Sequence, residues 1–227
     1  MLLSVIIPVY NEELTVGNVI DRVKIAMRQI GLEYELIVVD DHSYDHSLKV
    51  AEEHSGKLYT LKQHLGKGYA LRAGFAQAKG DIIVTIDSDG SHRPEELAEV
   101  LAPVLQDKAD MVIGSRYLNH KRVAARKLNR FGVRIFNFLI QLFTGTASTD
   151  SQSGFRAMKR EVVDKLKLYA REYEIESEML VKTAKAGFRV AEVPISFEQR
   201  TYGRSGVDPL WDGSKILYSI WLARFRG

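Results

Sequence analysis

Two pairs of aspartates in this 227-residue chain directly follow apolar segments that predict buried strands. The first pair is Asp87 and Asp89, and the second is Asp40-Asp41. Two carboxylates at positions i and i+2 past a strand can face one ligand, and Mg²⁺ or Mn²⁺ takes such oxygens together with phosphate. Asp, Ser and Gly also form simple turns, which is the alternative. A second strand that also ends in aspartates favours a ligand-binding site over a turn. Carboxylates placed close together repel one another unless a cation or a hydrogen-bond donor binds to them.

Positive charge is concentrated in one segment of the chain. Between Met111 and Thr149 there is no Asp or Glu, and the basic residues there are Arg116, Lys121, Arg122, Arg126, Lys127, Arg130 and Arg134. The rest of the chain holds 25 basic against 29 acidic residues, although the total net charge is only +3. A cationic segment on an acidic body indicates an anionic partner such as nucleic acid, anionic lipid or phosphate; a solvated basic loop is the alternative.

Three shorter motifs have the composition of anion-binding loops. Gly66-Lys67-Gly68 opens a predicted helix and can offer amide groups and an ammonium, although an ordinary loop fits it too. The polar segment Asp150–Arg156 ends on a guanidinium that can reach a carboxylate or a phosphate. Arg200–Gly206 is a cationic loop that can close over phosphates. Glu174, Glu176 and Glu178 place three carboxylates on one predicted helix. Their mutual repulsion argues against a helix face that is simply exposed to solvent.

The segment 130–143 predicts an amphipathic helix with one narrow polar stripe. The stripe consists of Arg126, Arg130, Arg134, Asn137 and Gln141, and aromatic and aliphatic residues cover the remaining circumference. Such a helix either belongs to the core or lies in a membrane interface, and the adjoining basic run favours the interface. Its longest apolar stretch is Ile135–Phe143, whereas a membrane span needs about 20 residues. The start of the chain reads as a strand and not as a signal peptide, so we expect a cytoplasmic protein.

The first half of the sequence alternates strands and helices, which predicts an α/β fold with a mostly parallel sheet covered on both faces. Functional residues of such sheets collect at the carboxyl ends of strands, so Tyr10–Glu12, Asp40-Asp41 and Asp87–Asp89 are expected to share one crevice. The predicted strands are Val5–Val9, Glu35–Val39, Leu58–Leu61, Ile82–Ile86 and Asp110–Ile113, and the predicted helices are Leu14–Ile30, Ser47–Glu53, Gly68–Lys79 and Pro94–Gln106.

The second half of the chain breaks this alternation. Helices are predicted at Phe131–Phe143, Arg160–Leu166, Ile175–Ala186 and Gly213–Arg226, with one strand at Val190–Phe197. No repeat or low-complexity linker separates the halves, so we expect one domain with a helical appendage. The chain has 45% hydrophobic residues and no Cys, which indicates an ordinary globular core and excludes a disulfide scaffold, a thiolate metal site and a Cys nucleophile.

In their order along the chain these motifs resemble glycosyltransferase family 2, a GT-A-fold family, and most of all its dolichol-phosphate mannose synthase branch. The resemblance runs from Val5 to about Ser205, nearly the whole chain. The matching pieces are Val5–Glu12, Val38–Ser43, Gly66–Gly68, Ile86–Asp89, Gly114–Tyr117, Asp150–Arg156, Glu192–Ile195 and Arg200–Ser205.

The resemblance implies an inverting, metal-dependent transfer of a hexose from a nucleotide diphosphate sugar to a polyprenyl or dolichyl phosphate at the cytoplasmic face of a membrane. It implies that residues 1–114 form a nucleotide-sugar-binding half and residues 115–227 an acceptor-binding half. It also implies that the protein binds an anionic membrane surface. The donor site would comprise Pro8, Tyr10, Glu12, Asp41, Lys67, Asp87, Ser88, Arg200 and Arg204. Mg²⁺ or Mn²⁺ would be held by Asp87, Asp89 and the third position, Ser91; the acceptor phosphate by Arg116 and Arg130. Asp89, Arg116 and Asp150 would be the catalytic residues, Asp150 either orienting the acceptor or acting as a base.

Several positions depart from the family pattern. Ser91 stands where the mannose synthases often have Gln, His42 replaces the usual Gly of the Asp-Asp-Gly-Ser motif, and Gly206 replaces a Lys. Mannose from GDP-mannose leads as donor, with UDP-glucose and UDP-N-acetylglucosamine as alternatives. A transferase with a soluble or glycan acceptor is a second possibility. A non-catalytic nucleotide- or nucleic-acid-binding module is a third, although the sequence contains no recognisable nucleic-acid-binding motif.

Overall fold

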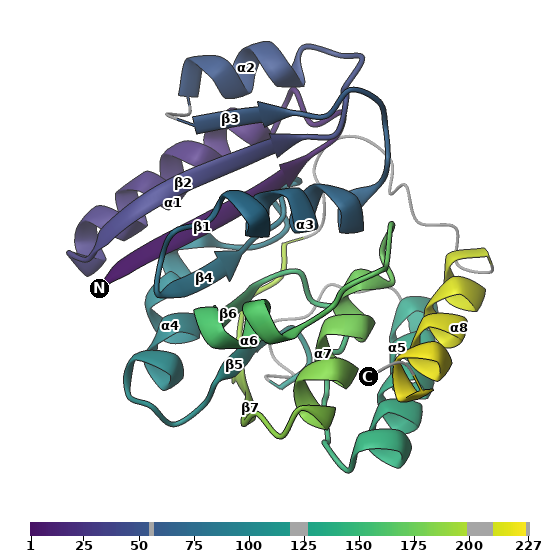
Figure 1. The fold of residues 1–227 in the computed structure, drawn as a ribbon. Helices are drawn as coiled ribbons and strands as arrows, with labels where there is room; N and C mark the ends of the chain where they lie inside the picture. Colours follow the sequence, from purple (N-terminus) through teal and green to yellow (C-terminus); the bar gives the residue numbers. More distant parts are fainter. Residues whose placement is uncertain (55–56, 119–126, 199–210, 226–227) are drawn as a thin grey trace.

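The computed structural model describes residues 1–54, 57–118, 127–198 and 211–225. These residues build a seven-stranded sheet in the order β3-β2-β1-β4-β6-β5-β7, with helices on both faces (Figure 1). All neighbouring strands are parallel except where β6 pairs with β4 and β5. The predicted α/β class is therefore confirmed. The strands are β1 (Leu2–Val9), β2 (Glu33–Asp40), β3 (Lys57–Thr60), β4 (Ile82–Thr85), β5 (Met111–Ser115), β6 (Arg156–Lys159) and β7 (Val190–Pro194).

The helices follow the predicted ranges to within a few residues at either end. A short 3-10 turn, η1 (Pro94–Glu96), enters the fourth helix with Pro at its first position, as helix N-termini favour. The first helix ends at Gly31, whose φ of 74° is the left-handed conformation common at helix C-termini. The helices are α1 (Val16–Ile30), α2 (Ser47–His54), α3 (Lys67–Gln77), α4 (Leu97–Leu105), α5 (Lys127–Thr144), α6 (Arg160–Lys165), α7 (Ile175–Lys185) and α8 (Trp211–Phe225).

Strand β6 is the element that the sequence did not reveal; its segment was expected to be a loop leading into the helix at Arg160. Four residues with a basic residue at each end carry too little alternation to predict a strand. Because β6 is antiparallel, its first residue Arg156 pairs with Thr85 and with Ile113, near the carboxyl ends of β4 and β5. The loop that precedes β6 therefore reaches the same edge of the sheet as the loops that follow the parallel strands.

Two apolar clusters cover the two faces of the sheet. One joins alternate residues of β1 to α1, α2 and α4, and the other joins the opposite faces of β1 and β2 to α3, α6 and α7. The central strands are buried on both sides, which explains their almost continuous apolar sequences. Because helices pack on both faces of the sheet, the positions of the strand ends are fixed.

Helices α5 and α8 pack side by side and against α7 (Figure 1). Ile140 of α5 and Ile216 and Ile220 of α8 are buried in their shared cluster. On the outward side the two helices leave six large apolar side chains exposed: Ile135, Phe138, Leu142, Leu217, Tyr218 and Trp221. The predicted helix 130–143 thus combines a core face with an exposed apolar face. Among the described helices, none has both the length and the apolar character that crossing a membrane requires.

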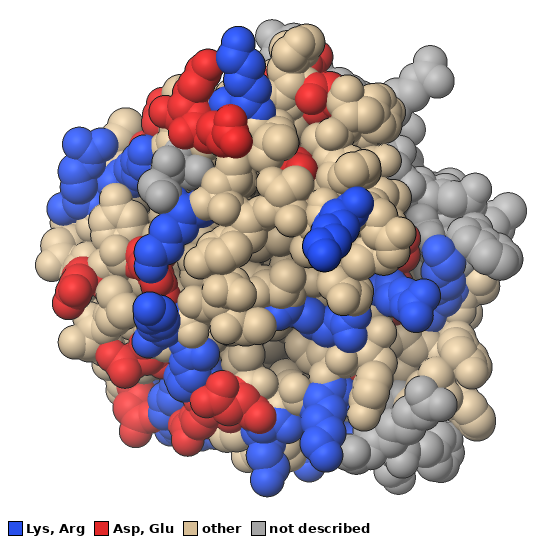
Figure 2. All heavy atoms as spheres, turned by 45° about the horizontal axis from the view of Figure 1, so that its top comes forward, with Lys and Arg blue, Asp and Glu red and all other residues tan. Residues whose placement is uncertain are grey.

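The charged side chains do not separate by sign on the face shown in Figure 2. Basic and acidic groups are interspersed around a largely uncharged centre on this side of the molecule. A nucleic-acid-binding surface is expected to present a field of one sign. The described residues of this face do not form such a field.

Candidate functional site

The carboxyl ends of β1, β2 and β4 lie at the same edge of the sheet because these strands are parallel neighbours. Side-chain hydrogen bonds tie their loops together. The Ser88 hydroxyl donates to the carbonyl of Pro8 (2.8 Å), and the Thr85 hydroxyl donates to the carbonyl of Gly154 in the loop before β6 (2.8 Å). The edge therefore carries the donor-side residues expected from the sequence together with the Asp150–Arg156 loop.

Asp41 is almost fully buried and holds the loop that precedes α3. Its carboxylate accepts hydrogen bonds from the main-chain N–H groups of Leu65 and Gly66 (both 2.8 Å) and lies 2.8 Å from Nδ1 of His64. The ring of His64 in turn stacks on the ring of Tyr10, with centroids 3.9 Å apart and planes 15° apart. Asp41 and Tyr10 are thus linked through His64, a residue that no sequence motif singles out.

The turns after β1 and β2 contain residues in the left-handed backbone region. Asn11 has φ 54° and His42 has φ 61°. Side chains other than Gly, Asn and Asp adopt this region at an energetic cost. His42 is the position where the family motif usually has Gly, and its conformation gives the physical reason for that preference. Asn11 stabilises the same region, because its side-chain oxygen accepts a hydrogen bond from the N–H of Tyr44 (3.0 Å).

Asp87 follows β4 and is paired with a lysine. Nζ of Lys67, the first residue of α3, lies 2.6 Å from Oδ1 of Asp87 and 2.7 Å from Oε1 of Glu176 on α7. Burial alone would raise the pKa of Asp87, but the charges of Lys67 and His92 and the hydrogen bonds from both side chains together outweigh burial and hold this pKa well below its ordinary value. Burial raises the pKa of Glu176. The Glu174–Glu178 carboxylates stand out in the sequence, but their spacing does not reveal that Glu176 faces Lys67.

Two further residues enclose the Asp87 carboxylate. A Cβ on Gly154 would lie 2.4 Å from Oδ2 and 2.5 Å from Oδ1 of Asp87, so only glycine fits at this position. Nε2 of His92 lies 3.5 Å from Oδ2 of Asp87, and the His92 ring is buried against Phe155 and Phe197. The loop before β6 therefore closes directly over Asp87.

Asp89 lies two residues further along the same loop and is half-buried. Its Oδ1 accepts a hydrogen bond from the main-chain N–H of Ser91 (2.9 Å), and Ser91 itself is buried. Asp87 and Asp89 offer oxygen atoms only, the donor type that Mg²⁺ and Mn²⁺ prefer. In the described part of the chain no cluster of three or more acidic or His side chains could hold an ion by itself. The two carboxylates therefore fit a metal that also takes diphosphate oxygens.

Arg116, which directly follows β5, forms a two-pronged ion pair with Asp150. Nε and Nη2 of Arg116 donate to the two oxygens of Asp150 at 2.6 and 2.7 Å, and the main-chain N–H of Arg116 donates as well (3.0 Å). Asp150 is completely buried, whereas the Arg116 side chain is 17% exposed and lies over the ring of Phe197. The contact leaves the N–H groups of Nη1 outside the Asp150 fork, so Arg116 can still bind an anion.

Glu192 of β7 organises the loop that carries Asp150. Its carboxylate accepts hydrogen bonds from the Ser148 hydroxyl (2.6 Å), from both the N–H and the hydroxyl of Thr149 (2.9 and 2.5 Å) and from the N–H of Asp150 (3.3 Å). The Thr149 hydroxyl also lies 2.6 Å from that of Ser115 at the end of β5. Glu192 belongs to one of the matching motifs, but the sequence alone did not assign it a role.

The expectation that Arg156 reaches a ligand is wrong. Its guanidinium is completely buried, and it donates to the main-chain carbonyls of Ser151 (2.7 Å), Ser153 (2.9 Å) and Glu176 (2.8 Å). A guanidinium has five N–H donors and can satisfy several carbonyls at once. Arg156 therefore shapes the loop before β6 and binds it to α7.

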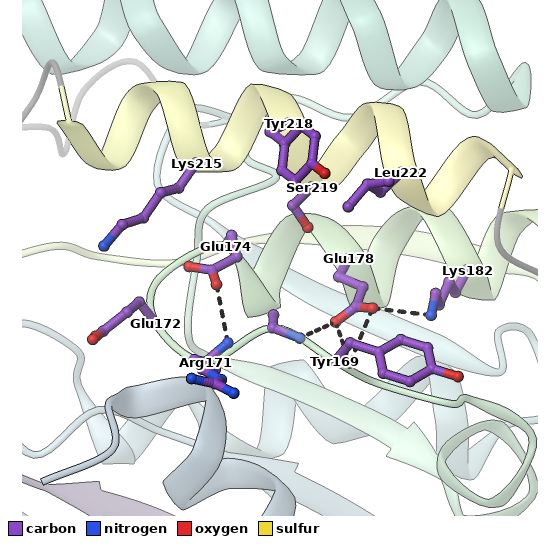
Figure 3. Close-up of a pocket in the computed structure, with 11 residues that line it drawn as sticks. Tyr169, Arg171, Glu172, Glu174, Glu178, Lys182, Lys215, Tyr218, Ser219 and Leu222 are labelled. Atoms are coloured by element: carbon purple, nitrogen blue, oxygen red, sulfur yellow. Dashed lines mark hydrogen bonds and ion pairs between the residues drawn. The ribbon is translucent and has the colours of Figure 1, made fainter.

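A cavity of about 410 Å³ lies between α7, α8 and the 169–174 loop (Figure 3). Figure 3 shows Glu178 at its floor, where the carboxylate accepts hydrogen bonds from the N–H groups of Tyr169 and Ala170 and pairs with Lys182. Glu174 likewise accepts the N–H of Arg171 (2.9 Å). These carboxylates are engaged with the main chain of residues 169–171, so they hold this loop against α7.

A second cavity of about 340 Å³ adjoins the Arg116–Asp150 pair. It is lined by residues close to that pair in the chain and by polar and apolar residues of α5, namely Tyr117, Ser148, Thr149, Val133, Arg134, Asn137, Phe138 and Gln141. Asn137 accepts a hydrogen bond from the N–H of Ser151 (3.1 Å), which links α5 to the loop before β6. The cavity therefore runs between the candidate site and the exposed apolar face of α5.

Some candidates lie outside the described residues. Arg126, Arg200 and Arg204 belong to segments that the structure does not describe, and Arg130 lies on α5 with a side chain that is not described.

Comparisons with known proteins agree with this architecture. The family model described as glycosyl transferase family 2 matches residues 4–167. The chain is 31% identical to the UDP-N-acetylglucosamine–dolichyl-phosphate N-acetylglucosaminyltransferase of Methanococcus voltae, over 96% of this chain and 94% of that protein. It is 30% identical to the undecaprenyl-phosphate 4-deoxy-4-formamido-L-arabinose transferase of Pseudomonas fluorescens, over 91% of this chain but only 60% of that relative.

A solved structure supports the fold. The glucosyl-3-phosphoglycerate synthase of Mycobacterium tuberculosis, in complex with Mn²⁺, UDP and phosphoglyceric acid, superposes with a TM-score of 0.79. The match covers 98% of this chain and 78% of that one at 23% identity. A likeness at this identity concerns the arrangement of the sheet and helices.

Proposed function

The chain belongs to glycosyltransferase family 2, and from this premise we propose that it transfers a hexose, with inversion, from a nucleotide diphosphate sugar to a polyprenyl phosphate. The observation that carries the proposal is the placement of two anion-handling groups at one sheet edge. The carboxylates of Asp87 and Asp89 follow β4, and the Asp150-held guanidinium of Arg116 follows β5, with the loop before β6 joining them. The acceptors named for both relatives are lipid phosphates, which supports the same reading.

The donor side of the proposal uses the ends of β1, β2 and β4. Tyr10 and Asp41 would receive the nucleoside, and Lys67 would approach the diphosphate. Pro8, Glu12, Asp87 and Ser88 complete this side, and Arg200 and Arg204, outside the described residues, are proposed to close over it. The hydrogen bond between Ser88 and Pro8 and the stacking of Tyr10 on His64 support a preformed pocket.

We assign the metal position to Asp87, Asp89 and Ser91, the last acting through the N–H that orients Asp89. A divalent ion held there would neutralise the negative charge that develops on the leaving diphosphate. Mn²⁺ and UDP in the Mycobacterium tuberculosis complex support a metal of this kind. The residues of this chain bind and orient the donor, and no covalent intermediate with the protein is required.

On the acceptor side, Arg116 is proposed to hold the phosphate, together with Arg130. A phosphate monoester is already largely ionised at neutral pH, because its second pKa is near 6. The attacking oxygen therefore needs positioning more than deprotonation. Asp150 is buried and engaged by both prongs of Arg116, which supports a role in positioning Arg116 in preference to a role as base. The cavity lined by Val133 and Phe138 offers room for the first part of the lipid.

The donor sugar has three candidates. Mannose from GDP-mannose is favoured by the resemblance of the motifs to the mannose synthase branch. N-acetylglucosamine from UDP-N-acetylglucosamine is favoured by the name of the Methanococcus voltae relative. Glucose from UDP-glucose is the third, and the UDP in the Mycobacterium tuberculosis glucosyl-3-phosphoglycerate synthase complex favours a UDP sugar of either kind. All three reactions would use the same site residues, so the donor screen decides between them.

Location at a membrane surface is part of the proposal. The exposed Phe138 and Leu142 of α5, 64% and 65% exposed, and Trp221 of α8 would enter the headgroup region. Basic residues of α5 would meet anionic lipids there. The whole chain would act as one catalytic domain, with 1–114 binding the nucleotide sugar and 115–227 binding the acceptor.

The test is a donor screen with GDP-mannose, UDP-glucose and UDP-N-acetylglucosamine, each with undecaprenyl phosphate and Mg²⁺ or Mn²⁺. We expect one donor to give a radiolabelled lipid product, and we expect Asp89→Ala to abolish it. Lys108→Gln, a change on the exposed surface, is the control. Absence of product with every donor, combined with oligonucleotide binding that weakens steeply with salt, would instead support the nucleic-acid-binding module.

A further inference from the structure

We propose that the ammonium group of Lys67 occupies the cation position at Asp87 when no divalent metal is bound, and that Glu176 keeps Lys67 beside the site once the metal takes Asp87. The inference rests on the proposed function for the identity of the metal. It adds a competition between a lysine and a metal ion for one carboxylate, and it gives the buried Glu176 a positioning role.

The ammonium bridges two carboxylates from different parts of the fold. Lys67 begins α3, Asp87 follows β4 and Glu176 lies on α7. The two N–O distances, 2.6 Å to Asp87 and 2.7 Å to Glu176, are those of direct ion pairs. Because a small cation between two carboxylates is the arrangement that a metal site also presents, Lys67 stands in for a metal at Asp87.

The other approaches to the Asp87 carboxylate are restricted. Gly154 is packed against both of its oxygens, and Nε2 of His92 lies 3.5 Å from Oδ2. A divalent ion that binds Asp87 therefore competes with Lys67 for Oδ1. Two cations a few ångströms apart in a half-buried site repel each other strongly, so Lys67 and the metal cannot both contact this oxygen.

Glu176 determines where Lys67 goes. Its side chain is only 3% exposed, and a buried carboxylate without a cation is costly. Arg156 does not provide that cation by direct contact, because its guanidinium donates to the main-chain carbonyl of Glu176 and not to the carboxylate. Lys67 therefore stays on Glu176 after it leaves Asp87, and its ammonium remains at the mouth of the site, where the donor diphosphate is proposed to bind.

The experiment measures Mn²⁺ binding by electron paramagnetic resonance, with and without UDP, whose diphosphate would supply further oxygen ligands, and with neither sugar donor nor acceptor present. Lys67→Gln alone would leave Glu176 buried without a partner, so the main variant is the double change Lys67→Gln/Glu176→Gln. This variant keeps the net charge and a polar pair but removes the ammonium from Asp87. We expect it to bind Mn²⁺ at least about tenfold more tightly than the wild type. Glu176→Gln alone should bind Mn²⁺ severalfold more weakly, because Lys67 then has Asp87 as its partner.

Lys108→Gln, a distant exposed charge change, is the control, and it should leave Mn²⁺ affinity within about twofold of wild type. Equal Mn²⁺ affinity of the double variant and the wild type overturns the competition. Tighter Mn²⁺ binding by Glu176→Gln overturns the role given to Glu176, whereas a merely structural Glu176 would lower the melting temperature without changing Mn²⁺ affinity. If neither wild type nor double variant binds Mn²⁺, with or without UDP, the metal assignment of the proposed function fails, and this inference fails with it.

Discussion

The guanidinium of Arg116 and the carboxylate of Asp150 meet in a two-pronged ion pair across 34 residues of sequence. The pair persists although Asp150 is completely buried, because the main-chain N–H of Arg116 binds the same carboxylate. Such a geometry fixes the plane of the guanidinium. A phosphate that binds Arg116 would therefore meet donors that are already oriented, which lowers the entropic cost of placing it.

Replacing Asp150 by Asn tests this positioning role. The Asn side chain has one oxygen, so it can accept a hydrogen bond from only one of the two Arg116 nitrogens. It also leaves the charge of Arg116 without its carboxylate partner. We expect kcat/KM for the lipid phosphate to fall by about 10–100-fold, which corresponds to about 1.4–2.8 kcal/mol, mainly through a higher acceptor KM. Steady-state kinetics with a varied acceptor checks this, and Arg116→Lys, which removes the fork but keeps a charge, should show the same pattern. A loss confined to kcat, with a changed pH profile, would instead identify Asp150 as a base.

Glu192→Gln should disturb the same site from a distance. Its carboxylate accepts hydrogen bonds from Ser148, Thr149 and the N–H of Asp150, and an amide in its place would point N–H groups at some of these donors. We expect the free energy of unfolding to fall by about 1–3 kcal/mol and the acceptor KM to rise while the donor KM stays unchanged. Urea denaturation and two-substrate kinetics measure both quantities. Glu99→Gln, on the exposed face of α4, is the matched control. An unchanged acceptor KM in Glu192→Gln would show that Glu192 does not position Arg116 through Asp150.

The ion pairs at the opposite edge of the sheet predict a pH dependence of stability. Asp110 accepts hydrogen bonds from Arg189 and lies 2.9 Å from Nζ of Lys159; the hydrogen bonds from Arg189 hold its pKa below its ordinary value despite burial. A carboxyl whose pKa is lowered in the folded state stabilises above its unfolded pKa of about 3.9 and loses this effect as the pH falls through the folded value. Asp110→Asn should therefore be less stable than wild type by about 1–3 kcal/mol at pH 7, with a difference that shrinks below about pH 4.

Urea denaturation at pH 7, 5, 4 and 3 measures that difference. Asp164→Asn removes a carboxylate that is 63% exposed and lies 3.9 Å from Arg160, so it should show little difference at any pH. A difference for Asp110→Asn that is the same at every pH would contradict the linkage.

The exposed apolar face of α5 and α8 predicts binding to lipid vesicles. In Phe138→Glu/Leu142→Glu two carboxylates would replace the two most exposed apolar side chains in the described part of α5. We expect retention on vesicles containing phosphatidylglycerol to fall at least about tenfold, because burying each such side chain contributes about 1.5–3 kcal/mol. Sedimentation with vesicles measures this. Leu105→Glu, at an exposed position at the end of α4, is the control, and equal loss in both variants would show that charge alone is responsible.

Much of the fold follows from local patterns. Apolar runs between polar turns predicted the strands around Ile6, Val38 and Val84, and the rule that parallel strands end at one edge brought Asp41 and Asp87 together. These predictions succeed because both signals depend on neighbouring residues. Strand β6 was missed because its partners, β4 and β5, select a four-residue segment that carries no strong pattern of its own.

The contacts within the site were harder to predict. Lys67 and Asp87 were expected to bind the same ligand, and the structure pairs them with each other, together with Glu176. Arg156 looked suited to an anion, yet three main-chain carbonyls take its donors. Glu176 lies on α7, far in sequence from Lys67, and the carbonyls of Ser151 and Ser153 face Arg156 only because of the local turn before β6, so residue spacing alone does not predict these contacts.

The antiparallel β6 also affects how the protein folds during synthesis. Strand β4 is bordered by β1 on one side and by β6 on the other. A nascent chain that has not yet reached Lys159 therefore carries β4 as an open, mostly apolar edge strand, of the kind that pairs with other chains and aggregates. The pairing of β4 with β6 joins segments more than 70 residues apart, so we expect this part of the sheet to form slowly and to need protection on the ribosome until β6 emerges.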